Sequence, residues 1–268
     1  EAREEAVNSP AMDLKLSGKV AIVTGASRGI GRAIAQMLAA EGMKLSLVAR
    51  SKDQLDELAK SLTTDCLVQA VDLRKPDSVA AVVDATMKKF GVIDLLVNNA
   101  GATKRGVFFE LPDADWEDGF ALKFFGSMRL TRAAWKHLMA SRGSIVNIIG
   151  IGGRTGNADF TIGGSVNAAC RLLTKALADR GVKDGVRINA INPGFIKTER
   201  LETRVKTFAQ EHSLPLDQAE VQLAKATGVA RFGEPAEVAS AVAFLASPAS
   251  GYCHGALLDL DGGQTRTL

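Results

Sequence analysis

The stretch Thr24-Gly25-Ala26-Ser27-Arg28-Gly29-Ile30-Gly31 decides how this chain folds. It follows residues 19–24, a short apolar run that predicts a buried strand, and it opens residues 30–41, whose apolar side chains recur at helical spacing. Gly25 permits a tight turn, whereas Gly29 and Gly31 allow the backbone and the helix to approach a pyrophosphate. The free N–H groups at a helix N-terminus favour phosphate. A glycine triplet alone is weak evidence, but this placement between strand and helix predicts a dinucleotide site that includes Ser27, Arg28 and Ile30.

Short apolar runs alternate with helical patterns along the rest of the chain. Helices are predicted over 52–61 and 76–90, the second of which begins with proline. Runs of strand length bounded by Gly, Asn and Asp are typical of a parallel sheet covered on both faces. The sequence therefore predicts an α/β fold, a Rossmann-type doubly wound, mostly parallel seven-stranded sheet with helices on both faces. The remaining predicted strands are 44–49, 66–71, 93–97, 144–149, 186–191 and 256–260.

The chain of 268 residues has no Pro- or Gly-rich linker, so residues 12–268 are predicted to form a single domain. Residues 1–11 are expected to be a disordered extension or an expression remnant, with Met12 a plausible natural start. The segment 199–228 is polar and helical although it follows a strand. We expect it to be an excursion over the site, such as a substrate lid.

Composition argues against a nucleic-acid partner and against a membrane span, and we expect a small-molecule substrate. The net charge is only +3 and the basic residues are mixed with acids, which argues against nucleic acid, and no apolar run is long enough to span a membrane. The three cysteines and three histidines are widely spaced, so no metal site is expected. Reduced thiols and a charged N-terminal stretch without an apolar core favour a cytoplasmic protein.

The end of the second strand bears on which dinucleotide is bound. An NAD site usually places an acid there for the ribose 2′-hydroxyl, but this chain has Ala49 followed by Arg50. Together with Arg28 in the glycine loop, Arg50 suits a 2′-phosphate. NADP(H) is therefore preferred and NAD(H) remains possible, because both arginines would look the same if they were merely solvated.

Further motifs follow the glycine loop in a fixed order, and from about residue 16 to residue 263 the sequence resembles the short-chain dehydrogenase/reductase family. The motifs that carry the resemblance are Asp72-Leu73, Asn98-Asn99-Ala100-Gly101, Asn192-Pro193-Gly194 and Asp259-Leu260-Asp261-Gly262-Gly263.

The resemblance implies roles for these residues in holding the cofactor. Asp72 and Leu73 would contact the adenine, and Asn99, Ala100 and Gly101 would line the cofactor. It also implies a homo-oligomer, a tetramer or dimer, with the fifth and sixth helices and the last strand at its interfaces. The nicotinamide end would be held by Pro193, Gly194, Ile196 and Thr198.

The family's catalytic positions depart from its pattern. Its chemistry uses Asn, Ser, Tyr and Lys: the tyrosine passes a proton to the substrate oxygen, the lysine binds the nicotinamide ribose and lowers the tyrosine pKa, the serine orients the substrate, and the asparagine holds a water. Counting from Trp116 and along the helix that follows the fifth strand, all four are changed. The residues expected at the Asn, Ser, Tyr and Lys positions are Lys123, Gly150, Gly163 and Asn167.

The lysine and the asparagine have thus exchanged places. In the family fold the two side chains approach each other through a water, so Lys123 could bind the ribose, donate the proton or bind an anionic substrate. The alternative is that Lys123 extends to solvent and the exchange is coincidence.

Other proton donors are poor candidates. The only tyrosine, Tyr252, is expected to be structural, and Asp159 is more simply a helix N-terminal acid. The aliphatic hydroxyls nearby are weaker acids than a phenol; they belong to Thr155, Thr161 and Ser165.

Glycines gather where substrate should lie, at 150, 152, 153, 163 and 164, which indicates either a roomier pocket or a site no longer under chemical demand. Three functions remain open. The first is an NADP(H)-dependent oxidoreductase with a non-standard proton relay. The others are a non-redox lyase or isomerase and a catalytically silent NADP(H)-binding sensor or partner subunit.

Overall fold

The computed structural model describes residues 13–266, in which one seven-stranded sheet has the order β3-β2-β1-β4-β5-β6-β7. Every neighbouring pair of strands is parallel, so the expected sheet is confirmed and is more uniform than "mostly parallel". The residues predicted to lie outside the domain, 1–11, fall outside the described part of the chain. The strands are β1 (Val20–Thr24), β2 (Lys44–Ala49), β3 (Cys66–Ala70), β4 (Leu95–Asn98), β5 (Ser144–Ile148), β6 (Arg187–Pro193) and β7 (Leu257–Leu260).

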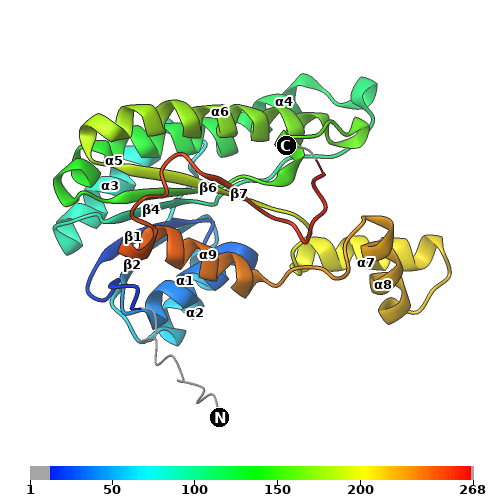
Figure 1. Ribbon diagram of the computed structural model, residues 1–268, viewed down its shortest axis with the longest axis horizontal. Helices are drawn as coiled ribbons and strands as arrows, with labels where there is room; N and C mark the ends of the chain where they lie inside the picture. The colour runs from blue at the N-terminus through cyan, green and yellow to red at the C-terminus, as the bar shows by residue number, and fades with distance from the viewer. Residues whose placement is uncertain (1–12, 267–268) are drawn as a thin grey trace, which may run out of the picture.

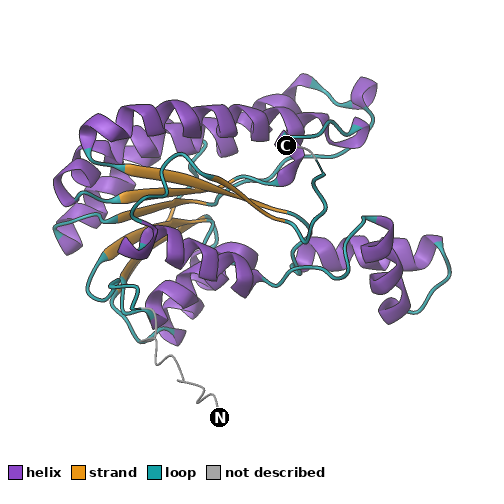
Figure 2. Cartoon of the chain, in the orientation of Figure 1, coloured by secondary structure: helices purple, strands orange, loops and turns teal. Residues whose placement is uncertain are grey.

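Helices cover both faces of the sheet, as Figures 1 and 2 show. On one face, α1 (Gly29–Ala40), α2 (Lys52–Ser61) and α9 (Pro235–Ala246) bury their apolar sides against the strands. On the other face, α3 (Pro76–Phe90), α5 (Ser127–Ser141) and α6 (Thr161–Asp184) do the same. Strands such as β1 are buried along their whole length, which explains why they read as continuous apolar runs rather than alternating ones.

Several predicted strand boundaries differ from the observed ones by one or two residues. The fourth strand begins at Leu95 rather than at residue 93 and includes Asn98, and the sixth runs on through Pro193. Asn98, Asn192 and Pro193 therefore pair within the sheet instead of following it. Proline is tolerated at the end of β6, although it has no N–H to donate, because the hydrogen bond to β7 there is donated by the next residue, Gly194, to the carbonyl of Leu260.

The long helix expected around Trp116 is continuous but not uniform. It begins as α4 (Asp113–Phe120), passes through η2 (Ala121–Gly126), a π-helical stretch, and continues as α5. π-Helical turns are rare and occur often at functional sites, because they reorient the side chains that they carry. Lys123 lies in this stretch.

The segment 199–228 is helical as predicted and forms α7 (Glu199–Glu211) and α8 (Leu216–Ala226). Figure 1 shows both helices beyond the end of the sheet and apart from its two helical layers. They share a small apolar core of their own, centred on Leu201, Val205, Leu223 and Phe232. This local core explains how a polar segment outside the main core stays ordered.

The described part of the chain also contains four short 3-10 turns: η1 (Phe108–Glu110), η3 (Ile151–Gly153), η4 (Ala158–Phe160) and η5 (Pro248–Ser250). Within residues 13–266, none of the helices combines the length and the apolar character needed to cross a membrane.

Candidate functional site

The glycine loop joins β1 to α1 at the carboxyl edge of the sheet, next to the point where the strand order reverses between β1 and β4. In open α/β sheets, the neighbouring loops form a crevice at this point, and ligands bind there. Gly25 and Gly29 have positive φ angles of 66° and 54°, which residues with a side chain rarely adopt. A Cβ on Gly31 would lie 2.1 Å from the carbonyl oxygen of Gly25, so only glycine fits there.

The segment after β4 forms hydrogen bonds with Thr24, at the start of the glycine loop. The amide of Asn99 donates to the carbonyl oxygen of Thr24 at 2.9 Å, and the backbone N–H groups of Asn99 and Ala100 donate to the Thr24 hydroxyl at 2.9 and 3.0 Å. That hydroxyl donates to the carbonyl of Val97 at 3.1 Å. The structure thus brings together the first strand, the glycine loop and residues 99 and 100.

The start of α1 is open to an anion. Its N-cap residue, Arg28, makes no side-chain cap, and no acid lies in the first turn, so the first N–H groups have no side-chain acceptor. Ser27 and Ile30 belong to this same turn. Positive helix ends of this kind bind phosphate groups.

The two arginines expected to select NADP(H), Arg28 at the N-cap of α1 and Arg50 just after β2, are exposed. Arg28 pairs with Glu199, the first residue of α7, at 3.0 Å. Arg50 follows β2, and its charge, after the hydrogen bond and charge of Arg74, helps to lower the pKa of Asp118. No acid follows β2 directly.

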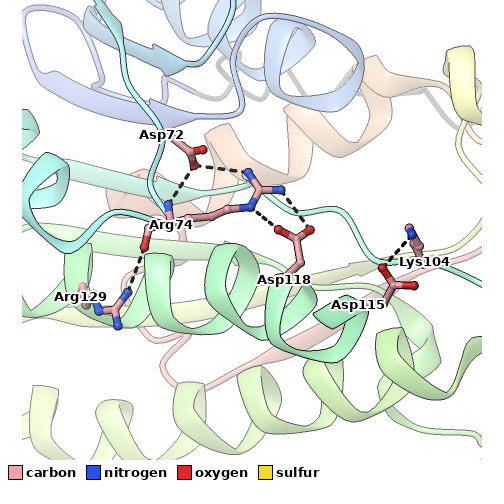
Figure 3. A network of polar contacts seen from close by, with 6 residues as sticks. All are labelled: Asp72, Arg74, Lys104, Asp115, Asp118 and Arg129. Atoms are coloured by element: carbon pink, nitrogen blue, oxygen red, sulfur yellow. Dashed lines mark hydrogen bonds and ion pairs between the residues drawn. The ribbon is translucent and has the colours of Figure 1, made fainter. Parts of the chain in front are cut away.

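Asp72, expected at the adenine end, is held by Arg74, as Figure 3 shows. Asp72 follows β3 and accepts from the backbone N–H of Arg74 at 3.0 Å and from its guanidinium at 3.3 Å. The same guanidinium donates to both oxygens of Asp118 on α4, at 2.5 and 3.2 Å. Leu73 is buried beside them. This network fixes the loop after β3 at the edge of the crevice.

The segment after β6 completes the expected cofactor frame. Gly194 donates its N–H to the carbonyl of Leu260 at 3.0 Å, and Ile196 is buried and bridges to Gly233. A Cβ on Gly29 would lie 3.3 Å from the Thr198 methyl group, so this segment reaches the glycine loop. Pro193 is the last residue of β6, and its neighbours therefore start from the carboxyl edge. The residues present fit an extended dinucleotide lying across this edge.

Lys123 and Asn167, predicted to have exchanged places, are in direct contact. The Lys123 ammonium donates to Oδ1 of Asn167 at 2.6 Å and also to the carbonyl oxygen of Ile149 just after β5. Asn167 is buried in α6, so its amide is held in place. The alternative that Lys123 extends to solvent is wrong, because its ammonium is directed into the protein.

The surroundings of Lys123 change its acidity. Burial lowers the pKa of Lys123 to about 8; the Cys170 thiol opposes this shift and the positive charge of Arg200 adds to it. The methylene stem packs on Gly101, where a Cβ would lie 3.0 Å from Cδ of the lysine. An ammonium with this pKa exchanges its proton near neutral pH, as an efficient acid or base must.

The glycines near the substrate region accommodate Phe160, which sequence reasoning missed. A Cβ on Gly163 would lie 2.0 Å from Cζ of Phe160, and one on Gly152 would lie 2.8 Å from the same ring. The ring of Phe160 therefore occupies the space beside Gly163, and the reading of these two glycines as a roomier pocket is wrong. The signal in the sequence was the aromatic residue three positions before a glycine pair.

Gly150 and Gly153 have different reasons to lack a side chain. Gly150 has a φ of 121°, and a Cβ on it would lie 3.2 Å from Nδ2 of Asn167. Gly153 packs against the backbone of α6, with atoms of Asn167 and Ala168 at 2.8 Å from its hypothetical Cβ. The loop after β5 is thereby pressed onto the first turns of α6.

The other candidate proton donors are poorly placed. Tyr252 is fully exposed near the C-terminal end of the chain. Asp159 lies in η4, just before α6, where its backbone N–H donates to Asn157. Thr155 and Ser165 are exposed, whereas the hydroxyl of Thr161 is buried without a hydrogen-bond partner.

Comparison with known proteins agrees with this geometry. A family model described as enoyl-(acyl carrier protein) reductase matches residues 25–265. The 3-oxoacyl-[acyl-carrier-protein] reductase FabG of Vibrio cholerae is 36% identical over 257 residues, covering 94% of this chain and 99% of that protein. The oxidoreductase UcpA of Escherichia coli is 35% identical over 258 residues, covering 94% and 96%.

The similarity extends to solved structures. The crystal structure of L-sorbose reductase from Gluconobacter frateurii, complexed with NADPH and L-sorbose, superposes with a TM-score of 0.91 at 34% identity. The match covers 96% of this chain and all of that one. With its parallel sheet, glycine loop and Asn99 anchor, the chain belongs to the short-chain dehydrogenase/reductase family.

Proposed function

We propose that this protein is an NADP(H)-dependent oxidoreductase that interconverts a carbonyl compound and its alcohol, with Lys123 as the proton donor. The observation that carries the proposal is the Lys123 ammonium, held by Asn167 and by the Ile149 carbonyl at the carboxyl edge of the sheet. The Lys123 stem packs on Gly101, one of the residues expected to line the cofactor.

The preference for NADP(H) rests on charge. Arg28 is the N-cap residue of α1 and Arg50 directly follows β2, where no carboxylate is present to bind a free ribose hydroxyl. Guanidinium groups suit a 2′-phosphate, since they offer paired N–H donors. The related L-sorbose reductase was crystallised with NADPH, which supports the same choice.

Reduction of a carbonyl adds a hydride to carbon and a proton to oxygen. When bound, the nicotinamide supplies the hydride. Lys123 has three N–H donors, of which Asn167 and Ile149 accept two. The third is free for the substrate oxygen, and the lowered pKa allows the ammonium to release its proton to the developing alkoxide. The packing of its stem on Gly101 fixes the direction of that donor.

We further propose that Lys123, Gly150, Gly163 and Asn167 stand where the family has Asn, Ser, Tyr and Lys. Phe160 supports this, because a tyrosine at 163 would meet its ring. The usual phenol is then replaced by an ammonium that reaches the site from the opposite helix.

The test combines cofactor binding with turnover. The purified protein is expected to bind NADPH more tightly than NADH, measured by calorimetry, and to oxidise NADPH at 340 nm with at least one member of a panel of ketones, aldehydes and 2-oxo acids. Tight binding of NADPH without turnover of any carbonyl, imine or enoyl compound would overturn the proposal in favour of a sensor or partner subunit. Conversion of a substrate without net change in NADPH would overturn it in favour of a lyase or isomerase.

A further inference from the structure

Three arginines from two segments gather beside the proposed site. Arg105 lies in the loop after β4, and Arg200 and Arg204 lie in the first two turns of α7. Arg200 and Arg204 are four residues apart and so share one face of the helix. The positive charge of Arg200 lowers the pKa of both Lys123 and Arg105, so the group extends from the Lys123 ammonium outward to α7.

Two of these guanidinium groups rest on aromatic rings. Arg105 lies 4.1 Å from the ring centroid of Phe160, the side chain beside Gly163, and Arg204 lies 4.5 Å from that of Phe195. Stacking uses the face of a guanidinium and leaves its N–H donors free at the edge. The rings therefore hold the groups in place without consuming their hydrogen-bonding capacity.

No carboxylate pairs with any of the three among residues 13–266, in contrast to Arg28 and Arg74, which both have acidic partners. Among acids, Asp159 acts on Arg105, and its charge raises the pKa of that guanidinium. That contribution is the smallest of those acting on Arg105. Burial lowers the pKa of Arg105 most, followed by the charges of Arg204 and Arg200.

The three guanidinium groups are exposed and partly screened by water, but the charges of Arg204 and Arg200 still lower the pKa of Arg105, which shows that like charges act on one another here. An oxoanion between the guanidinium edges would relieve the repulsion and accept several charge-assisted hydrogen bonds. Because α7 carries two of the three groups, the same anion would connect the excursion 199–228 to the body of the site.

We infer that the substrate carries an oxoanion, a carboxylate or phosphate group, which Arg105, Arg200 and Arg204 bind while its carbonyl faces Lys123. The inference rests on the proposed function, because it specifies the class of carbonyl compound that the site accepts. It also gives α7 a role, in which substrate charge draws the helix over the site.

The test uses two pairs of carbonyl compounds that differ in charge. Phenylpyruvate is compared with its methyl ester, and dihydroxyacetone phosphate with dihydroxyacetone, by NADPH oxidation. We expect the charged member of at least one pair to have a kcat/KM at least about tenfold higher, and the pair that shows it identifies the carboxylate or the phosphate.

The variants R204M and R105M are expected to remove this preference by raising KM for the charged compound roughly tenfold or more, with little effect on its neutral partner. Lys206→Met is the matched control, because it removes one positive charge from the same helix two residues beyond Arg204. Equal use of charged and neutral compounds, or equal effects of R204M and K206M, would overturn the inference.

A binding measurement separates this inference from the proposed function. Phenylacetate, which has no ketone to reduce, is titrated by calorimetry into the protein saturated with NADPH. Binding that weakens in R204M but not in K206M supports the anion site even if no carbonyl compound is ever reduced. Turnover of neutral compounds alone, with no phenylacetate binding, would retain the oxidoreductase and refute the anion site.

Discussion

The ammonium of Lys123 lies 2.6 Å from the amide oxygen of Asn167, so a side chain from the η2 stretch and one from α6 meet directly at the carboxyl edge of the sheet. Asn167 is buried, and the same ammonium also donates to the carbonyl oxygen of Ile149. Burial lowers the pKa of Lys123 to about 8, so its acidity depends on the packing around this contact.

Replacing Lys123 with methionine should abolish turnover. Loss of a general acid commonly reduces the rate by about 10²–10⁴-fold, and methionine retains the length of the stem without the donor. The measurement is the rate of NADPH oxidation together with the Kd of NADPH. Lys60→Met is the control, since it removes an exposed lysine in the last turn of α2, at the opposite edge of the sheet.

We expect Lys123→Met to lower kcat at least about hundredfold, or to weaken NADPH binding at least about tenfold if the ammonium acts mainly on the ribose. If neither quantity differs from its value in Lys60→Met, Lys123 has no role in the reaction.

The pH profile should report the same group. The protonated ammonium is the donor in reduction, so the rate of reduction is expected to be full below pH 8 and to fall as the pH rises through about 8. Oxidation of the alcohol needs the free amine and should rise over the same range. The groups facing Lys123 are the amide of Asn167, the Cys170 thiol and the Arg200 guanidinium.

Arg200→Met should move this transition to higher pH, because removing a nearby positive charge raises the pKa of Lys123. Lys206→Met should leave it in place. A reduction rate that stays constant from pH 7 to pH 9.5 would contradict the assignment.

Because Phe160 packs on Gly163, the effect of Gly163→Ala on stability should change sign when Phe160 is removed. Gly163→Ala alone should destabilise the protein by about 1–3 kcal/mol, because the new methyl group would meet the ring at 2.0 Å. In a Phe160→Ala background the same change should stabilise the protein by up to about 1 kcal/mol, since alanine is the better helix former.

Chemical denaturation of the four proteins in this cycle gives the coupling free energy between the two positions. Additive effects would show that the ring does not restrict position 163 in solution.

The cofactor preference should depend on Arg28 and Arg50. Replacing either with alanine is expected to raise the Kd of NADPH about ten- to hundredfold while leaving that of NADH nearly unchanged, because only NADPH has the 2′-phosphate. Glu199→Gln should tighten NADPH binding a few-fold, since it releases Arg28 from its ion pair. Equal losses for both cofactors would assign these arginines to stability instead.

The sequence was sufficient to predict the fold because each buried strand is a short apolar run and each covering helix has one apolar face. The glycine loop was equally clear, since a Cβ at Gly31 would collide with the backbone of Gly25. The strand ends were less clear: Asn98, Asn192 and Pro193 are polar or turn-forming residues that nonetheless pair within the sheet. Local preference did not indicate this because neighbouring strands supply their partners.

For the candidate catalytic residues too, the sequence indicated some features and only the structure showed the others. The family resemblance, counted along the chain, marked Lys123 and Asn167 as a pair of candidate residues. Nothing in the sequence indicated that the ammonium points inward or that its pKa is lowered. The place of Phe160 beside Gly163 and the gathering of Arg105 with Arg200 and Arg204 were also invisible, because each joins segments far apart in the chain.

The sequence by itself therefore determined the parallel sheet, the dinucleotide loop and the family, all of which depend on local patterns and on the order of those patterns along the chain. The tertiary structure alone decided what surrounds Lys123. Acidity, steric exclusion and charge repulsion arise from atoms that only the folded chain brings within a few ångströms of one another, and these properties set the chemistry that we propose.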